Sequence, residues 1–373
     1  MVPDVVIVGA GVIGGGIACE LTRHGMSVLL LDRQKPAAEA TWAAAGMLAP
    51  SPNGPDSIAL VPLARASLDL YPAFVDAVEA DSGIRVGFRR HGSLAVFFGA
   101  GATGERDRYL AGLLALGLGG EPLDAEELRR REPRLNPGVG AGVWLAQEAS
   151  VDNRVLGRAL AVAAERQGTE LRCGVEVTGL AVEGHRCLGV QTSSGKIAAG
   201  HVVIAAGCYS SRIETAMRYA PTQPVRGQMV ALDAGAALPA SSLRMGASHG
   251  YIVPRGDGRV VAGSTLEDAG FDKSVTPGGV GKILAAAVVL APALERAPIL
   301  EVWSGLRPDT PDHLPVLGPT DIPGLSIATG HYRNGILLAP ITARLARQWL
   351  LGQQTDMDLA AFSPMRFGES GER

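Results

Sequence analysis

Three residues outside the glycine-rich start of the chain have side chains that could bind a small substrate: Arg307, Tyr251 and Arg333. Arg307 lies between Trp303 and Pro308 in an otherwise apolar segment. An arginine there must be solvated by water, paired with a carboxylate of the protein or used to bind a ligand. Its guanidinium has a fork of donors that matches a planar carboxylate bidentately. We therefore expect Arg307 to bind a substrate carboxylate, and the alternative is a structural salt bridge.

Tyr251 and Arg333 are expected to complete this site. Tyr251 stands in an alternating apolar pattern, so its hydroxyl needs a partner if it is buried, and the alternative is a plain sheet-core residue. His249 precedes Tyr251 by two residues on the same face of the strand and would line the mouth of the pocket. The alternative is a polar neighbour whose hydrogen bonds are made within the protein. Arg333 precedes the apolar segment Ile336–Leu351, with Asn334 as a helix cap. We expect it to help hold the substrate, unless it is an exposed loop arginine.

The first 32 residues carry the pattern of a dinucleotide-binding unit. Val5–Val8 reads as a fully buried strand, and a G-x-G-x-x-G turn and a helical repeat follow it. Gly9 permits the tight turn, Gly11 lets backbone amides approach a pyrophosphate, and Gly14 allows close packing of helix and strand. Asp32 ends the second strand 18 residues after Gly14, where its carboxylate can accept hydrogen bonds from a ribose. A glycine-rich turn without a ligand is the alternative, but the strand, helix and acid together favour nucleotide binding.

Later segments predict a discontinuous nucleotide domain. The runs His201–Gly207 and Leu325–Gly330 read as buried strands that end in small residues, so backbone can approach a cofactor there. Between them, the alternating runs Gly250–Pro254 and Arg259–Gly263 indicate a largely antiparallel sheet. The fold class is therefore α/β, a dinucleotide-binding Rossmann domain with an inserted substrate domain. The expected bounds are 1–85, 150–220 and 305–373 for the nucleotide domain, and 86–149 and 221–304 for the substrate domain.

Composition excludes several classes of protein. The 373 residues include 34 basic and 37 acidic side chains, which gives a formal net charge of −3. This balance provides no excess of positive charge that would favour binding to nucleic acid or to an anionic membrane. The four cysteines and seven histidines are scattered, so we expect no metal site and free thiols. The longest apolar stretch, Ile283–Ala291, is too short to cross a membrane, and the N-terminus lacks a basic leader. A cytoplasmic location is expected.

Three segments resemble the glycine oxidases of the D-amino-acid oxidase superfamily. They are the small-residue run Ala40–Pro50, which composition alone predicts to be a loop, and the segments Gly305–Asp312 and Gly330–Pro340. The similarity extends from Val5 to the Phe362–Pro364 tail. It implies a glutathione-reductase-like domain that holds FAD non-covalently, because related sarcosine oxidases tether FAD through a cysteine near positions 305–307, where this chain has none. It also implies a homo-oligomer, often a tetramer.

The resemblance assigns roles to particular residues. Tyr251 would lie beside the substrate carboxylate, and Leu266 and Ala49 would shape a small pocket. The start of the helix after Asn334 would point its amides at the flavin pyrimidine and stabilise the reduced cofactor. The remaining expected cofactor contacts are Val12, Ile13, Arg33, Ala44, Ala45, Gly46, Met47, Val177, Ala206, Gly207, Gly305, Gly335, Ile336 and Leu337.

The reaction that the resemblance implies is oxidation of glycine or of a small D-amino or N-methyl amino acid. The α-hydrogen would leave as hydride to flavin N5, dioxygen would reoxidise the flavin to give hydrogen peroxide, and the imine would hydrolyse to a 2-oxo acid and ammonia. Glycine would give glyoxylate, or an imine used in thiamine biosynthesis. Three alternatives stay open: a dehydrogenase that reduces a quinone or a protein, a subunit that works only within a hetero-oligomer, and an NAD-dependent Rossmann enzyme.

Overall fold

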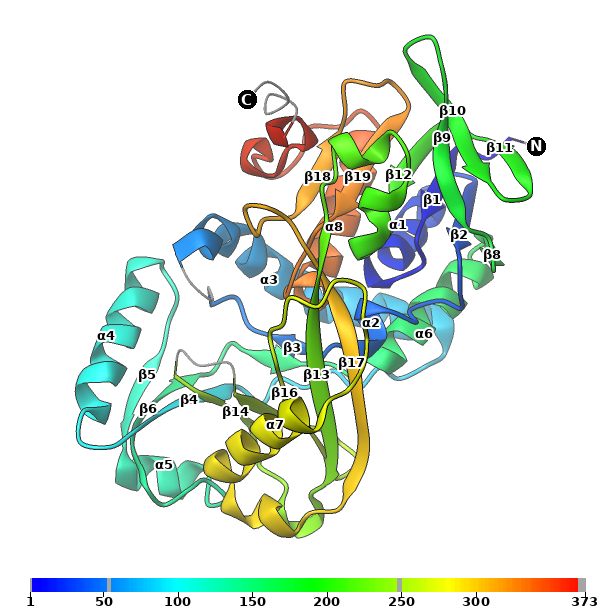
Figure 1. Ribbon diagram of the computed structural model, residues 1–373. Coiled ribbons are helices and arrows are strands. Elements are labelled where there is room, and N and C mark those ends of the chain that lie inside the picture. The colour runs from blue at the N-terminus through cyan, green and yellow to red at the C-terminus, as the bar shows by residue number, and fades with distance from the viewer. Residues whose placement is uncertain (1, 52–54, 247–249, 368–373) are drawn as a thin grey trace.

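The computed structural model describes residues 2–51, 55–246 and 250–367, and they form two sheet-based regions (Figure 1). The first region is built on a six-stranded sheet in the order β18-β19-β12-β1-β2-β8. All neighbours in it are parallel except β18 and β19. Its strands are β1 (Val5–Val8), β2 (Val28–Asp32), β8 (Glu170–Cys173), β12 (His201–Ile204), β18 (Val316–Pro319) and β19 (Leu325–Thr329). This confirms the α/β fold class predicted from the buried strands.

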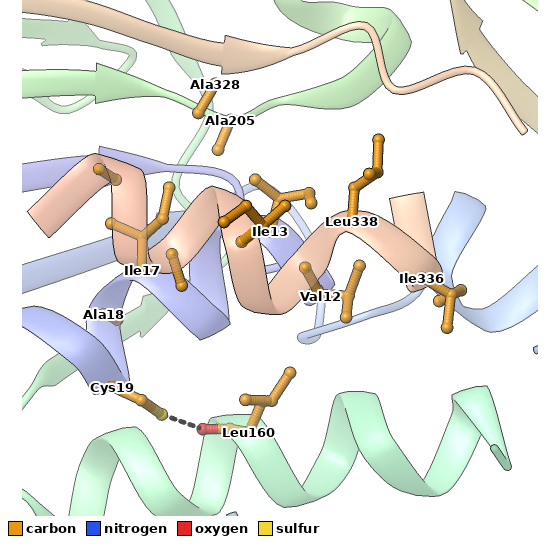
Figure 2. Close-up of a cluster of buried hydrophobic side chains, with 14 of the residues drawn as sticks. Val12, Ile13, Ile17, Ala18, Cys19, Leu160, Ala205, Ala328, Ile336 and Leu338 are labelled. Atoms are coloured by element: carbon orange, nitrogen blue, oxygen red, sulfur yellow. Dashed lines mark hydrogen bonds between the residues drawn. The ribbon is translucent and has the colours of Figure 1, made fainter. Parts of the chain in front are cut away.

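Helices cover this sheet and form a common core with it. They are α1 (Val12–Arg23), α3 (Val61–Ser82), α6 (Asn153–Arg166) and α8 (Gly335–Leu350). Figure 2 shows Ile13 of α1 close to Leu338 of α8, Ile17 further along α1, and Leu160 of α6 on the other side of α1. The thiol of Cys19 lies 3.5 Å from the Leu160 carbonyl oxygen. Helix α1 is thus fixed on both sides, which holds its N-terminus at the end of β1.

The second region is an eight-stranded sheet in the order β17-β13-β16-β15-β14-β4-β6-β5. Its neighbours are antiparallel except β14 and β4, which confirms the predicted largely antiparallel sheet. Its strands are β4 (Ser93–Phe98), β5 (Glu121–Asp124), β6 (Val139–Leu145), β13 (Gln223–Asp233), β14 (Ser242–Met245), β15 (Tyr251–Pro254), β16 (Arg259–Gly263) and β17 (Ile299–Asp309). Helices α4 (Ala102–Ala115), α5 (Ala125–Arg131) and α7 (Pro277–Leu290) lie with it in the lower half of Figure 1.

The chain crosses between the two regions several times. Strand β17 runs without interruption from Ile299 to Asp309, so position 305, the expected domain boundary, lies inside a strand. Two small sheets complete the fold. They are β9 (Val177–Glu183) with β10 (Arg186–Thr192) and β11 (Gly195–Ala198), and β3 (Met47–Leu48) with β7 (Ala149–Ser150).

The expectation of a plain loop at Ala40–Pro50 is wrong. This segment contains the short helix α2 (Ala40–Ala43) and strand β3. Its alanines gave no helical or alternating pattern, because the segment is ordered by contacts from far along the chain. The indole of Trp303 donates a 3.0 Å hydrogen bond to the Ala43 carbonyl, and β3 pairs with β7.

One described segment, Ile58–Ser82, has the length and composition of a membrane-crossing helix. Within it, α3 packs against α6 and α8. Ser67 donates a 2.6 Å hydrogen bond to the Leu337 carbonyl, and Tyr71 donates a 3.0 Å bond to the Ile336 carbonyl. Helix α3 is therefore packed as a core helix in this structure.

Candidate functional site

A cavity of about 560 Å³ runs between the two regions. At one end it is lined by the β1–α1 turn, at the middle by segment 44–47 and the start of α8, and at the other end by the eight-stranded sheet. The predicted site residues that line it are Gly9, Gly11, Val12, Ile13, Asp32, Arg33, Ala44, Ala45, Gly46, Met47, Ala49, Val177, Ala206, Gly207, Tyr251, Gly305, Arg307, Arg333, Asn334, Gly335 and Ile336. The structure thus brings together residues that lie up to 327 positions apart in the chain.

The glycines of the β1–α1 turn are required by close backbone approaches. Gly9 has a φ of +107°, and a Cβ there would lie 2.5 Å from the Ala205 carbonyl oxygen. A Cβ on Gly14 would overlap the Gly9 carbonyl, so Gly14 serves the packing of helix on strand and does not itself line the cavity. Both observations match the tight turn that a dinucleotide-binding motif needs.

Asp32 is held in a fixed orientation at the same end. Its Oδ2 accepts a 2.8 Å hydrogen bond from the Ala10 amide, and its Oδ1 accepts a 2.8 Å bond from the Gln34 amide. Burial raises the pKa of Asp32, while these two amides act in the opposite direction. The lone pairs that remain on each oxygen are available to ribose hydroxyls, as the motif predicts.

Segment 44–47 is held by buried polar groups. Arg255 donates to the Val151 carbonyl at 2.7 Å, to the Ala45 carbonyl at 2.9 Å and to Asn153 Oδ1 at 2.9 Å. Burial lowers the pKa of Arg255. Gly46 has a φ of +70°, and a Cβ there would overlap the Val151 carbonyl. These contacts fix the backbone that forms the middle of the cavity wall.

Gly305 is required by packing between α2 and β17. A Cβ at this position would overlap the Cβ of Ala43. The two backbones therefore approach more closely than any larger residue allows, and α2 covers one side of the cavity. Gly305 also lines the cavity itself.

The start of α8 is supported at the point where a proline weakens it. Pro340 has no N–H, so the Ile336 carbonyl four residues earlier lacks its usual helical donor. The Tyr71 hydroxyl donates to that carbonyl at 3.0 Å. Tyr71 is fully buried, and burial raises the pKa of its phenol. The first turn of α8 is thus kept in place with Gly335 and Ile336 facing the cavity.

Arg307 lies in the cavity wall at the end formed by the eight-stranded sheet. Its guanidinium lies over Gly227 of β13, where any Cβ would overlap it. Its Nη2 donates a 2.7 Å hydrogen bond to Ser264 Oγ, and Nη1 donates a 3.2 Å bond to the Thr265 carbonyl. Both acceptors are uncharged, and no carboxylate among the described residues pairs with Arg307. Burial, with the charge of nearby Arg333, lowers the pKa of Arg307.

The neighbouring arginine behaves differently. Arg226, one residue before Gly227 on β13, forms ion pairs with Glu267 at 2.5 Å and Asp272 at 2.6 Å. Its charge is therefore compensated within the protein, whereas the charge of Arg307 faces the cavity without a partner among the described residues. An uncompensated cation in a largely buried wall is suited to an anionic ligand.

Tyr251 and Arg333 line the same end of the cavity. The Tyr251 hydroxyl lies 3.6 Å from Met229 Sδ, and a Cβ on Gly263 would lie 2.7 Å from that hydroxyl. Arg333 precedes α8, and Asn334 is the N-cap residue of that helix as predicted, although its side chain makes no capping hydrogen bond. The alternative for Arg333 was an exposed loop arginine, but its side chain is half-buried and lines the cavity.

Besides Gly14, the predicted residues Leu266 and Leu337 do not line this cavity in the structure. His249 lies outside the described residues. Leu266 is 44% exposed and is not part of the wall, because it lies beyond the end of β16 with the polar residues that bind Arg226. Leu337 is 1% exposed and faces the core, where its carbonyl accepts from Ser67.

Several cavity residues were not predicted from the sequence. Arg244, Ser51 and Tyr109 line its far end, and His331 lies beside Arg333. Burial lowers the pKa of His331 to about 3, so its imidazole is neutral, and its Nε2 lies 3.1 Å from Thr342 Oγ1. Arg244 stands between Leu243 and Met245, and an arginine between two apolar residues was a signal that could have identified it.

Metal ligation and thiol chemistry have little support at this site. Among the described residues, no group of three histidine, cysteine, aspartate or glutamate side chains could hold a metal ion. Of the four cysteines, Cys208 lines the cavity, and burial raises the pKa of its thiol to about 12. Its thiol is therefore protonated at neutral pH.

Comparison with known proteins identifies the family. The family described as FAD dependent oxidoreductase matches residues 4–349. The chain is 39% identical to a bifunctional protein ThiO/ThiG of Trichormus variabilis over 98% of its length, but it covers 55% of that relative, so it spans about half the length of such bifunctional proteins. It is 36% identical to a glycine oxidase of Geobacillus kaustophilus, with 97% of each chain covered. A crystal structure of glycine oxidase from that organism superimposes with a TM-score of 0.92 at 33% identity, covering 98% of each chain.

Proposed function

We propose that this chain, which belongs to the FAD-dependent oxidoreductase family, oxidises the amine of glycine or of another small amino acid. The observation that carries the proposal is the guanidinium of Arg307, which has no carboxylate partner among the described residues, in the wall of a cavity that begins at a dinucleotide-binding turn. Such a cavity takes a cofactor and a small anion side by side. The similarity to glycine oxidases narrows the anion to an amino acid.

The residues present fit FAD. Gly9 and Gly11 leave space at the N-terminus of α1 for a pyrophosphate, Asp32 offers carboxylate oxygens to a ribose, and segment 44–47 with the start of α8 would enclose the flavin. When bound, FAD supplies a two-electron acceptor that dioxygen can reoxidise to give hydrogen peroxide. We propose non-covalent binding, because no cysteine lies near positions 305–307 and burial keeps the thiol of Cys208 protonated.

The chain's own side chains would orient the substrate. The guanidinium of Arg307 would bind the carboxylate, and Tyr251 and Arg333, which line the same cavity near Arg307, would help to hold it. Anchoring the carboxylate would aim the α-carbon at the cofactor, so orientation supplies much of the acceleration. The N-terminus of α8 would stabilise negative charge that develops on the flavin ring.

The reaction balances without a catalytic base. The amino acid loses its α-hydrogen with two electrons and one proton from nitrogen, and dioxygen takes both to become hydrogen peroxide. Water then hydrolyses the imine to a 2-oxo acid and ammonia. For glycine the product is glyoxylate, and use of the imine in thiamine biosynthesis remains an expectation from the resemblance. We also propose a cytoplasmic homo-oligomer.

A substrate panel tests this proposal. The protein would be purified with its FAD and assayed in air for hydrogen peroxide with glycine, sarcosine, D-alanine, D-proline and several L-amino acids. We expect peroxide with glycine or its small relatives, and an equal amount of ammonia where the substrate is a primary amine such as glycine or D-alanine. Turnover that needs an artificial dye instead of oxygen would indicate the dehydrogenase alternative. No reaction with any amine under either condition would contradict the proposal.

A further inference from the structure

The far end of the cavity holds a second guanidinium. Arg244 lies on β14 directly opposite Tyr251 on β15, since these two residues are register partners in an antiparallel pair. Directly opposed residues point to the same face of a sheet, with Cβ atoms about 5 Å apart. Arg244 and Tyr251 therefore line the cavity side by side.

The strand order places this second guanidinium beyond Tyr251 as seen from Arg307. Arg307 lies over Gly227 of β13 and reaches the end of β16, and Tyr251 of β15 lies over Gly263 of β16. The next strand is β14. Neighbouring strands are about 4.8 Å apart, so Arg244 stands one strand further along the same wall. A substrate held by its carboxylate at Arg307 would extend its substituent in this direction.

The charge of Arg244 is retained and its position is fixed. Its Nη2 lies 2.9 Å from Glu148 Oε1, 3.0 Å from the Tyr109 hydroxyl and 3.2 Å from Ser51 Oγ. Glu148 is 1% exposed and also accepts hydrogen bonds from Ser51 and Ser93. Burial is the largest influence and would lower the pKa of Arg244, but Glu148 and the Tyr109 hydroxyl together outweigh it, so the pKa is raised.

The described residues use only part of the donor capacity of Arg244. A guanidinium has five N–H donors, and all three hydrogen bonds that the structure describes for Arg244 use Nη2. Its Nε is buried and has no hydrogen-bond partner among the described residues. A buried donor without a partner costs free energy, and a buried ion pair is no better for stability than an apolar pair of the same volume. Packing alone therefore does not account for a guanidinium here.

We propose that Arg244 and its partners form a second polar subsite of the substrate cavity, which binds an oxygen atom on the substituent of the amino-acid substrate. This inference rests on the proposed amine oxidation. The substrates favoured by the subsite are small amino acids with a carbon substituent on the α-carbon or the nitrogen that bears a hydroxyl or carboxylate group. Glu148 holds Arg244 in place and makes the pair neutral overall, so an uncharged hydroxyl suffices as the bound group.

Matched substrates that differ by one hydroxyl test the subsite. D-serine is compared with D-alanine, and N-(2-hydroxyethyl)glycine with N-ethylglycine, as the ratio of kcat/KM within each pair. We expect Arg244→Met to lower this ratio about tenfold or more in at least one pair, the loss typical of a hydrogen bond to a charged group. Arg244→Lys keeps a cation for Glu148 but loses the fork, so its ratio should lie between those of Arg244→Met and the wild type.

The control is Arg218→Met, which removes a largely exposed arginine that pairs with Asp321 and does not line the cavity. Its ratios should equal those of the wild type. Ratios for Arg244→Met within about twofold of wild type in both pairs would overturn the inference, because a merely structural ion pair affects both members alike. If Arg244→Met fails to bind FAD, the test uses Arg244→Lys instead. A ratio of kcat/KM in Arg244→Lys that equals the wild-type ratio in both substrate pairs then overturns the inference. Absence of turnover of every amine by the wild type would instead overturn the proposed function.

Discussion

Replacement of Arg307 gives the most informative test of substrate anchoring. Two hydrogen bonds from a guanidinium to a carboxylate contribute roughly 1.5–3 kcal/mol each, so Arg307→Met should lower kcat/KM for glycine by roughly 10² to 10⁴. Part of any loss has another origin, because Arg307 also holds Ser264 and the Thr265 carbonyl. That part affects all substrates equally.

A neutral analogue of the substrate separates the two contributions. Glycinamide has no carboxylate, so the assay compares kcat/KM for glycine with kcat/KM for glycinamide in the wild type and in each variant. We expect the preference for glycine to collapse in Arg307→Met and to recover only in part in Arg307→Lys, because an ammonium lacks the bidentate geometry. Arg218→Met serves as the control. Equal losses for glycine and glycinamide would refute carboxylate binding by Arg307.

Three further predictions concern the residues that hold the cavity wall. Tyr71→Phe leaves the buried Ile336 carbonyl without a donor, so the free energy of unfolding measured in urea should fall by about 1–3 kcal/mol, and an unchanged value would show that the bond is dispensable. Arg255→Met removes three hydrogen bonds behind segment 44–47, so the dissociation constant of FAD, measured by fluorescence, should rise, whereas equal affinity would contradict a positioning role. The pKa of His331 is lowered from 6.5 to about 3, so the unfolded state takes up the proton first as pH falls below 6.5, and stability declines. Between pH 7 and pH 5 this lowers the free energy of unfolding by about 2 kcal/mol. Urea titrations should show that His331→Gln abolishes this pH-dependent loss, whereas the control His185→Gln, at an exposed histidine, retains it.

The parts of the site that could be predicted from sequence are those encoded locally. Strand β1, its glycine turn and Asp32 follow one another within 32 residues, so buried runs and glycine spacing were sufficient to place them. Arg307 was noticeable because a charged residue interrupts an apolar strand. In both cases the signal lies within a few residues of the group that it identifies.

The parts that could not be predicted depend on pairing between distant strands. Arg244 lies beside Tyr251 only because β14 and β15 pair in that register, and β14 also pairs in parallel with β4 from much earlier in the chain. Arg255 reaches segment 44–47 across 210 positions. Periodicity carries no information about such contacts, so the helix and strand within Ala40–Pro50 and the exposed position of Leu266 were also missed.

The central claim is that this chain transfers electrons from the α-carbon of a small amino acid to bound flavin. The most direct measurement is anaerobic mixing of the purified FAD protein with glycine and with α-deuterated glycine, followed by the visible absorbance of the oxidised flavin. We predict that glycine bleaches the flavin, and that the deuterated substrate bleaches it more slowly because the α-C–H bond breaks in that step. A flavin that stays oxidised in the presence of glycine, sarcosine and small D-amino acids would contradict it.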